Sequence, residues 1–102
     1  MTTKITIIYD NPSDVDVFER GFAETRQLEL ARALPGLERL ESSKVWPKED
    51  GSATPAHRLI DLYFADYATA SAAVATEEAG RPFPSIFAIA TGGVRIAFAE
   101  VE

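Results

Sequence analysis

Hydrophobic positions alternate with other residues at the start of the chain and predict a strand over residues 4–9. Within it Ile5, Ile7 and Tyr9 share one face, and the residues between them share the other. Both faces are largely apolar, which is typical of a central strand covered on both sides. Turn-forming residues, in the order Asp-Asn-Pro-Ser, follow directly and end the strand.

A helix is predicted over residues 15–34, with Ser13 or Asp14 as its N-cap. Its apolar side chains form two stripes that a uniform helix does not align, because they are offset by roughly a quarter turn. One extra residue near positions 26–29 would align them, and a π-bulge accommodates such an insertion. The alternative is a regular helix with one broad stripe. The first stripe contains Val15, Phe18 and Phe22, and the second contains Leu30 and Leu34.

The rest of the pattern completes the order strand, helix, strand, strand, helix, strand, which is that of a ferredoxin-like domain. We therefore predict one α+β domain over residues 1–102, with a four-stranded antiparallel sheet and both helices on one face. The later elements are an edge strand at 37–46, a polar hairpin loop at 47–55, a strand at 57–65, a helix at 67–79 capped by Asp66 and stopped by Gly80, a short helical turn at 85–90 and a strand at 94–101.

Helices on one face leave the other face of this sheet uncovered, and the pattern predicts that face to be apolar. A patch of that size does not stay exposed on a stable monomer. We expect a second copy of the chain to cover it, sheet against sheet, in a homodimeric α+β barrel. The residues assigned to the patch are Ile5, Ile7, Tyr9, Leu59 and Tyr63.

Composition narrows the classes of partner and chemistry. The 102 residues carry a net charge of −6 without a run of basic residues, which argues against nucleic acid or an anionic membrane as partner. The absence of cysteine excludes disulfides and thiolate chemistry, and one histidine excludes a multi-histidine metal site within one chain. We predict no metal and no cofactor. Neither a signal peptide nor a membrane-spanning run is recognisable, so a cytoplasmic location is expected.

Two polar residues, Arg26 and Gln27, stand at the phase shift of the predicted helix. Arg26 lies near the apolar face in the frame of the first stripe, and Gln27 does so in the frame of the second. An arginine aimed under the helix would bind a carboxylate or phenolate through two hydrogen bonds. The alternative for Arg26 is a surface ion pair with Glu29, three residues later.

A carboxylate, Asp61, stands between an aliphatic and an aromatic residue on one face of the strand at 57–65. With Tyr63 it forms a candidate proton acceptor or hydrogen-bonding pair inside a cavity of the barrel. The alternative is a cross-strand ion pair at the subunit interface. The possible partners of Asp61 are Arg39, Arg58 and Arg95.

His57 is a weaker candidate for a catalytic base, because it begins a strand beside the polar loop, where we expect it to be exposed. Aromatic side chains are candidates for lining a hydrophobic pocket, although such residues more often belong to the core. The aromatic candidates are Tyr9, Phe22, Trp46, Phe83 and Phe87.

Four segments of the chain resemble the EthD family, which is named after a protein of ethyl tert-butyl ether degradation. The resemblance covers nearly the whole chain and is most specific in the first helix with its Leu-Pro-Gly stop and in the final GGVRI segment. It implies a ferredoxin-like subunit that forms a dimeric α+β barrel. The segments are KITIIYDNPSDVDVFERGFAETR, LARALPGLERLESSKV, RLIDLYFADYATASAAV and FPSIFAIATGGVRIAFAEVE.

The chain departs from the family at the phase shift. Members typically carry a motif similar to THxPLA before LPG, and the resemblance implies that its histidine is the best candidate for chemistry. Here the chain reads TRQLELA, one residue longer than expected and without the proline. Aligned from Phe18, Arg26 takes the place of the histidine; aligned from LPG, Gln27 does. Neither is a general base near neutral pH, because arginine stays protonated and glutamine does not titrate.

Two functions therefore remain open. The first is binding of a small apolar or aromatic metabolite under the first helix, in a degradative pathway, with Arg26, Gln27, Asp61 and Tyr63 as the polar contacts. The alternative is a cofactor-free isomerase, cyclase or oxygenase acting on an aromatic or lactone substrate, as in relatives of the dimeric barrel. Because the family histidine is replaced, whether the chain is an enzyme stays uncertain, and Asp61 or His57 would have to serve as the base.

Overall fold

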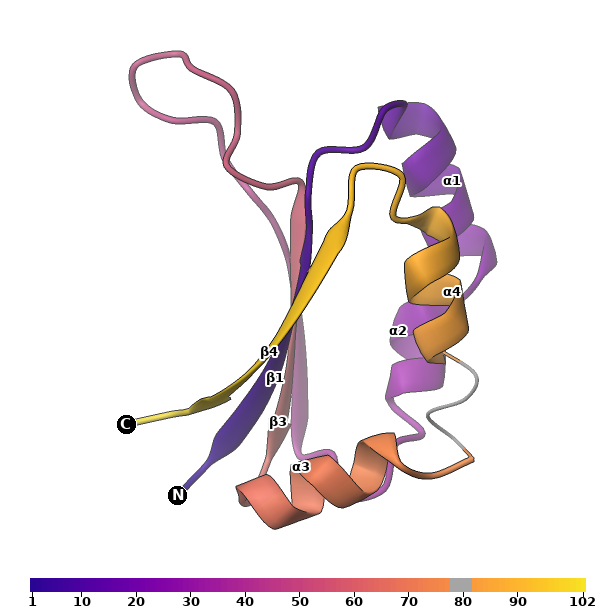
Figure 1. Cartoon of the computed structure of the whole chain (residues 1–102), viewed down its shortest axis with the longest axis vertical. Helices are drawn as coiled ribbons and strands as arrows, with labels where there is room; N and C mark the ends of the chain where they lie inside the picture. The colour runs from indigo at the N-terminus through magenta and orange to yellow at the C-terminus, as the bar shows by residue number, and fades with distance from the viewer. Residues whose placement is uncertain (78–81) are drawn as a thin grey trace.

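A single layer of helices covers one face of an antiparallel sheet in the computed structural model, which describes residues 1–77 and 82–102 (Figure 1). The sheet has four strands in the order β2-β3-β1-β4, and each neighbouring pair is antiparallel. This is the ferredoxin-like fold predicted from the sequence, with β2 at the edge and β1 at the centre. The strands are β1 (Thr3–Tyr9), β2 (Arg39–Lys44), β3 (Arg58–Phe64) and β4 (Val94–Glu100).

The two central strands, β1 and β3, alternate between buried and partly exposed residues. Their register pairs Ile7 with Ile60 and Ile5 with Leu62, so apolar side chains meet under the helices. Assigning Ile5, Ile7 and Tyr9 to the uncovered face was therefore wrong. Alternation tells which residues share a face, but it does not tell which face the helices cover. The uncovered face carries the opposite parity, including Lys4, Thr6, Ile8, Leu59, Asp61 and Tyr63.

The predicted helix at 15–34 is two short helices, α1 (Val15–Glu24) and α2 (Gln27–Ala31). The carboxylate of Asp14 caps α1 by accepting a hydrogen bond from the backbone N–H of Val17 at 3.1 Å. This satisfies one of the amides that the first turn of a helix leaves without a partner. Asp14, and not Ser13, is the cap.

The break between α1 and α2 lies at Arg26, whose backbone is left-handed with φ 54° and ψ 40°. A single residue in this conformation ends one helix and re-aims the next. The disturbance therefore falls at the predicted positions, 26–29, but it is neither a π-bulge nor a regular helix. The two apolar stripes face the same core because the chain turns between them: Phe18 and Phe22 are buried before the break, and Ala31 is buried after it.

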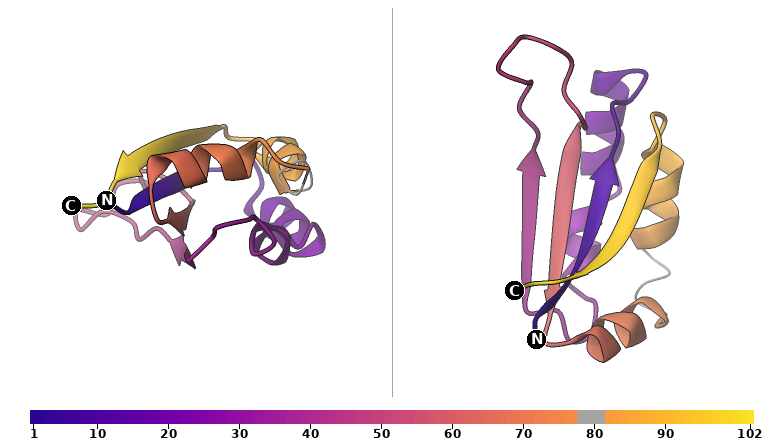
Figure 2. Two further views of the ribbon diagram at one scale, coloured as in Figure 1. Left: turned by 90° about the horizontal axis from the view of Figure 1, so that it is seen from below. Right: turned by 60° about the vertical axis from the view of Figure 1, so that its left-hand side comes forward.

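Two further helices complete the layer. Helix α3 (Tyr67–Val74) crosses one end of the sheet, and α4 (Pro82–Ile89) lies beside α1 and α2 (Figures 1 and 2). Ala70 and Ala73 of α3 are fully buried, since their small side chains allow the helix to approach the sheet closely. The predicted cap is confirmed: the carboxylate of Asp66 accepts from the backbone N–H of Thr69.

Both later helices differ in extent from the prediction. Helix α3 ends at Val74, before the predicted 79, and its predicted stop, Gly80, lies outside the described residues. Helix α4 begins at Pro82, before the predicted 85. Proline is favoured at the first position of a helix, where no intrahelical N–H is required.

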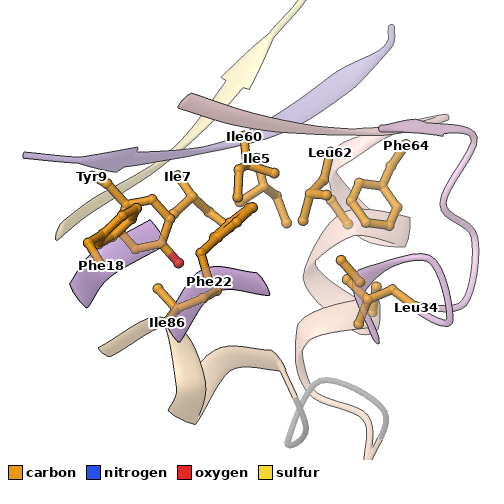
Figure 3. Close-up of a cluster of buried hydrophobic side chains, with 13 residues drawn as sticks. Ile5, Ile7, Tyr9, Phe18, Phe22, Leu34, Ile60, Leu62, Phe64 and Ile86 are labelled. Carbon is orange, nitrogen blue, oxygen red and sulfur yellow. The ribbon is translucent and has the colours of Figure 1, made fainter. Parts of the chain in front are cut away.

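The core fills the space between the helix layer and the sheet (Figure 3). Tyr9 and Phe18 meet edge to face, with ring centroids 5.0 Å apart, and Phe22 stacks beside Phe18 at 6.1 Å. These three aromatic residues occupy one end of the core and aliphatic residues fill the middle. The buried members of the core are Ile5, Ile7, Tyr9, Phe18, Phe22, Ala31, Leu34, Ile60, Leu62, Phe64, Ala70, Ala73 and Ile86.

The two chain ends lie side by side at one end of the sheet (Figure 1), where the backbone N–H of Val101 donates to the carbonyl of Thr2 at 2.8 Å. The long β2–β3 connection projects from the opposite end (Figure 2). Asn11, in the turn after β1, anchors this connection by exchanging two hydrogen bonds with Thr54, of 2.8 and 2.7 Å.

Candidate functional site

The break at Arg26 turns Gln27 towards the core and Arg26 towards solvent. Gln27 is 3% exposed. The side chain of Arg26 is 74% exposed and its Nε lies 3.3 Å from a carboxylate oxygen of Glu29, the surface ion pair that we considered as its alternative. Arg26 is the one non-glycine residue with positive φ in the described part of the chain. Its contribution to the site is thus the conformation of its backbone.

A tyrosine on β1 holds the inward-facing amide. The hydroxyl of Tyr9 donates to Oε1 of Gln27 at 2.5 Å. Burial raises the pKa of Tyr9 above its ordinary value, against the opposing influence of the bond to Gln27 and the charge of Arg58, so the hydroxyl keeps its proton at neutral pH. The other amide atom, Nε2 of Gln27, is buried without a hydrogen-bond partner among the described residues.

Gln27 borders a cavity between α2, α4 and the sheet. The cavity is small: the volume open to the centre of a water molecule is about 10 Å³, which is roughly enough for one water. Gln27 is the one polar side chain in the lining, and no charged side chain belongs to it among the described residues. Of the other predicted site residues, Phe83 lines this cavity. The lining residues are Ile7, Gln27, Leu28, Ala31, Leu34, Ile60, Leu62, Phe83 and Ile86.

Phe22 lies beyond the cavity lining, in contact with a buried arginine. The guanidinium carbon of Arg58 is 4.3 Å from the centre of the Phe22 ring. Phe22 also lines a shallow groove on the outer side of the helix break, together with Arg26 and Leu28. Leu28 borders both spaces and therefore separates the groove from the cavity.

A polar cluster lies beside this aromatic end of the core. Glu19 of α1 receives hydrogen bonds from Arg58 at 3.0 and 3.3 Å and lies 3.0 Å from Nε2 of His57, with Lys44 at 3.9 Å. Burial alone would raise the pKa of Glu19, but the bonds to His57 and Arg58 and the charge of Lys44 hold that pKa below its ordinary value.

His57 is consequently less exposed than expected, because its ring packs edge to face against Phe18 at 4.9 Å and 15% of its side chain is accessible. The sequence reasoning missed both Glu19 and Arg58 as members of an internal cluster. Arg58 had a signal: it shares the parity of Ile60 and Leu62, so it had to lie on the same face of β3. For Glu19 the sequence carried no comparable signal.

Asp61 and Tyr63 lie on the uncovered face of the sheet, which separates them from Gln27 and Tyr9. Asp61 accepts from the hydroxyl of Thr6 at 2.6 Å and lies 3.7 Å from Nζ of Lys4. Within the described part of one chain, Asp61 pairs with Lys4 and with none of the three arginines proposed as its partners, since the β1–β3 register places Thr6 directly opposite it. A pair with one of these arginines across a subunit interface stays a prediction. The predicted polar contacts thus divide between two faces.

Tyr63 makes its contacts with the edge strand. Its hydroxyl donates to Glu41 at 2.8 Å, and the guanidinium carbon of Arg39 lies 4.1 Å from its ring centre. The remaining aromatic candidates are exposed, with Phe87 at 60% and Trp46 at 86% accessibility. Neither lines the cavity.

In the described part of the chain, no group of three or more His, Asp or Glu side chains lies close enough together to hold a metal ion. Within residues 1–77 and 82–102, no helix has the length and apolar character needed to cross a membrane.

Comparison with family models gives no match. Among curated proteins, the chain is 28% identical over 99 residues to an uncharacterized 11.0 kDa protein in the thcB-thcC intergenic region of Rhodococcus erythropolis, a match that covers 97% of this chain and 94% of the other. The two proteins therefore resemble each other from end to end.

Solved structures give a closer likeness in fold than in sequence. An EthD family protein from Bacillus halodurans matches with a TM-score of 0.90 at 20% identity, over 100% of both chains. A dimeric ferredoxin-like protein of unknown function from Jannaschia matches at 0.72 and 17%, over 99% of this chain and 100% of the other. SnoaB, a cofactor-independent oxygenase from Streptomyces nogalater, matches at 0.64 and 14%, over 99% and 92%. The chain thus has the fold of a solved EthD family protein along its whole length, which confirms the predicted resemblance to that family.

Proposed function

We propose that this protein binds one small apolar or aromatic molecule between α2, α4 and the sheet, with Nε2 of Gln27 as its polar contact. The observation that carries this proposal is the buried amide donor at the edge of an otherwise apolar cavity. Apolar walls with a single placed polar group are typical of sites for small molecules.

A water molecule is a poor alternative occupant of the cavity. Buried waters are held by about three hydrogen bonds. Among the described residues this cavity offers one polar side chain, so a water bound to Gln27 would have its remaining hydrogen-bonding groups against apolar walls. An occupant with an apolar body and a hydrogen-bond acceptor satisfies both the walls and the amide.

The cavity must widen to receive such an occupant, because metabolite sites usually measure several hundred Å³. Two of its walls belong to helices and not to the sheet. Helix α4 contributes Phe83 and Ile86, and α2 contributes Leu28, which faces the outer groove on its other side. Leu28 lines both the cavity and the outer groove, so its side chain lies on the direct path between them.

A second part of the proposal is a homodimer formed through the uncovered sheet face. Ile8, Leu59 and Tyr63 are half-buried apolar or aromatic residues on this face, and its charges already have partners within the chain, as in the pair of Asp61 and Lys4. A ferredoxin-like neighbour is described as dimeric, which supports dimerisation without indicating the face. Light scattering at micromolar concentration should give the mass of a dimer, and a monomer alone would overturn this part.

Titration with toluene, followed by nuclear magnetic resonance of the backbone amides, tests the site. We expect saturable shifts at Leu28 and Ala31, which line the cavity, and none at Trp46, which is exposed on the projecting loop. Shifts confined to exposed residues would contradict the proposal.

A pair of matched variants separates the cavity from the surface of the same segment. Ala31→Val adds two methyl groups to the cavity lining, and Ala33→Val adds the same groups to an exposed position. Toluene should bind Ala33→Val as it binds the parent protein and should bind Ala31→Val several-fold more weakly, because the added volume fills the site. Equal binding by the two variants would place toluene elsewhere.

A second candidate function is cofactor-free oxygenation, isomerisation or cyclisation, which the likeness to SnoaB favours. The cavity lining offers no base among the described residues, so this function would depend on Asp61 or His57, both outside the lining. Turnover of an aromatic or lactone substrate that is lost in Asp61→Asn would support a carboxylate base at the subunit interface. Unchanged turnover in that variant and in His57→Gln would eliminate both candidates.

A further inference from the structure

The hydrogen bond between Tyr9 and Gln27 gives the amide a fixed direction. Tyr9 carries a proton that needs an acceptor, and Oε1 of Gln27 supplies it at 2.5 Å. The reverse orientation of the amide would leave the hydroxyl hydrogen without that acceptor and would turn Oε1 towards apolar walls. The observed orientation keeps the bond to Tyr9 and leaves Nε2 as the free amide atom, a donor that a ligand with an acceptor can satisfy.

In this orientation the described lining presents a hydrogen-bond donor and no free acceptor side chain. Nε2 is the buried, unpartnered atom, and the other lining side chains are apolar. A charged ligand group would enter without a counter-ion, because the described lining has no charged side chain. The desolvation cost of an unpaired ion excludes carboxylates and phenolates.

We propose that the Tyr9–Gln27 pair makes the site selective for neutral ligands that carry an oxygen acceptor, such as a ketone, a quinone or a lactone. This inference rests on the proposed binding function. Gln27 is then the contact residue, and Tyr9 is a positioning residue that decides which end of the amide meets the ligand. The selectivity differs from that expected of an inward-facing arginine, which would favour an anion.

Four probes of similar size separate the possibilities: acetophenone is a neutral acceptor, 1-phenylethanol both donates and accepts, ethylbenzene is apolar and benzoate is an anion. Acetophenone should bind the parent protein about tenfold more tightly than ethylbenzene, the equivalent of one net hydrogen bond. It should also bind several-fold more tightly than 1-phenylethanol, whose hydroxyl hydrogen would lack an acceptor. Benzoate should give no saturable shift at Ala31.

The decisive variant is Tyr9→Phe, which retains the ring and removes the hydroxyl. Without its partner the amide can turn and present Oε1, so the preference for acetophenone over 1-phenylethanol should fall from several-fold to about one. If Tyr9 had a purely structural role, the variant would bind both probes more weakly by the same factor, and the ratio of the two affinities would not change. That outcome would overturn the inference for Tyr9.

Gln27→Met provides a second test of the inference, which can be carried out even if the Tyr9→Phe variant does not fold. Methionine fills a similar volume without a donor, so acetophenone and ethylbenzene should bind this variant equally. A parent protein that binds these two probes equally, or prefers benzoate, would overturn the inference while leaving the binding function intact. If no probe shifts Ala31, the binding function fails and the inference fails with it.

Discussion

Two hydroxyl-bonded polar pairs lie on opposite faces of the same central strands and differ in how completely they are satisfied. On the covered face, Tyr9 donates to Gln27, which is 3% exposed and has an unpartnered Nε2. On the uncovered face, Thr6 donates to Asp61, which also has Lys4 at 3.7 Å and a side chain 15% exposed. The open-face pair is balanced in charge and reached by water, whereas the covered pair is neutral and has one donor to spare.

The difference shows that the role of a polar residue near a sheet depends on which face of the sheet it lies on. Asp61 and Gln27 look equally unusual in an apolar sequence, yet only Gln27 borders the cavity. The carboxylate occupies the face where its charge is compensated, and the neutral amide borders a cavity whose described lining has no charged side chain to compensate an ion. Variants at these positions should therefore respond very differently.

The largest effect is expected from Gln27→Glu. A carboxylate buried in this apolar position should lower the free energy of unfolding by about 3 kcal/mol at pH 8. Burial would raise its folded-state pKa above the unfolded value of about 4.3, so the penalty should be small below pH 4 and should grow as the pH rises towards the folded pKa. Urea unfolding at pH 4 and pH 8 measures this. On the open face, Asp61→Asn should change the stability of the monomer by less than about 1 kcal/mol, because water reaches the site when no second copy covers it.

Removal of each hydroxyl compares the pairs directly. Tyr9→Phe should cost about 1–2 kcal/mol, because Oε1 of Gln27 loses its partner in a dry environment. In the monomer, Thr6→Val should cost less than about 0.5 kcal/mol, since Asp61 keeps Lys4 and gains water. Both values come from urea unfolding at pH 7. Equal costs would show that the two faces do not differ in hydration.

A smaller effect is expected at Glu19, whose pKa is held below its ordinary value by His57 and Arg58. A carboxyl with a lowered folded-state pKa stabilises the fold above the unfolded pKa of about 4.3, and this stabilisation is lost as the pH falls through the folded pKa. Glu19→Gln should therefore lower stability by about 1 kcal/mol at pH 7 and by much less near pH 3. A difference that does not change with pH would assign the effect of Glu19 to packing.

The smallest effect is expected at Arg26, the left-handed residue between α1 and α2. Arg26→Gly should raise the free energy of unfolding by about 0.5 kcal/mol, because glycine adopts the left-handed conformation without steric cost and the lost surface ion pair is weak. Arg26→Val should lower it by about 1 kcal/mol or more, since a β-branched residue is strained at positive φ. Thermal unfolding of both variants in parallel measures the difference.

The sequence was sufficient for the order of strands and helices along the chain and for which strand residues share a face, because period-2 alternation in β1 and β3 and the capping residues Asp14 and Asp66 are local signals. It also located the disturbance at 26–29, since the offset between two apolar stripes is a property of the sequence alone. The kind of disturbance was not predictable. A left-handed residue and an inserted residue both shift a stripe, and arginine carries no special propensity for positive φ.

The site was only partly predictable for the same reason. Placing Gln27 inside required the frame after the break, and placing Asp61 required knowing which sheet face the helices cover. Neither fact is encoded within one element. The partnership of Tyr9 and Gln27 joins a strand to a helix 18 positions away, so it emerges only when the fold is assembled. Phe83 was recognisable as an aromatic residue, but its place in the lining depends on α4 packing beside α2.

The adjacency of the chain ends has a consequence for engineering. Val101 and Thr2 are joined by a backbone hydrogen bond, so a short linker could close the chain into a circle without moving a strand. New ends could then be opened in the connection between β2 and β3, which projects beyond the sheet (Figure 2). Such a permutant would keep all strand pairings and the Tyr9–Gln27 pair, while attaching any fused reporter at the end of the sheet opposite the present termini.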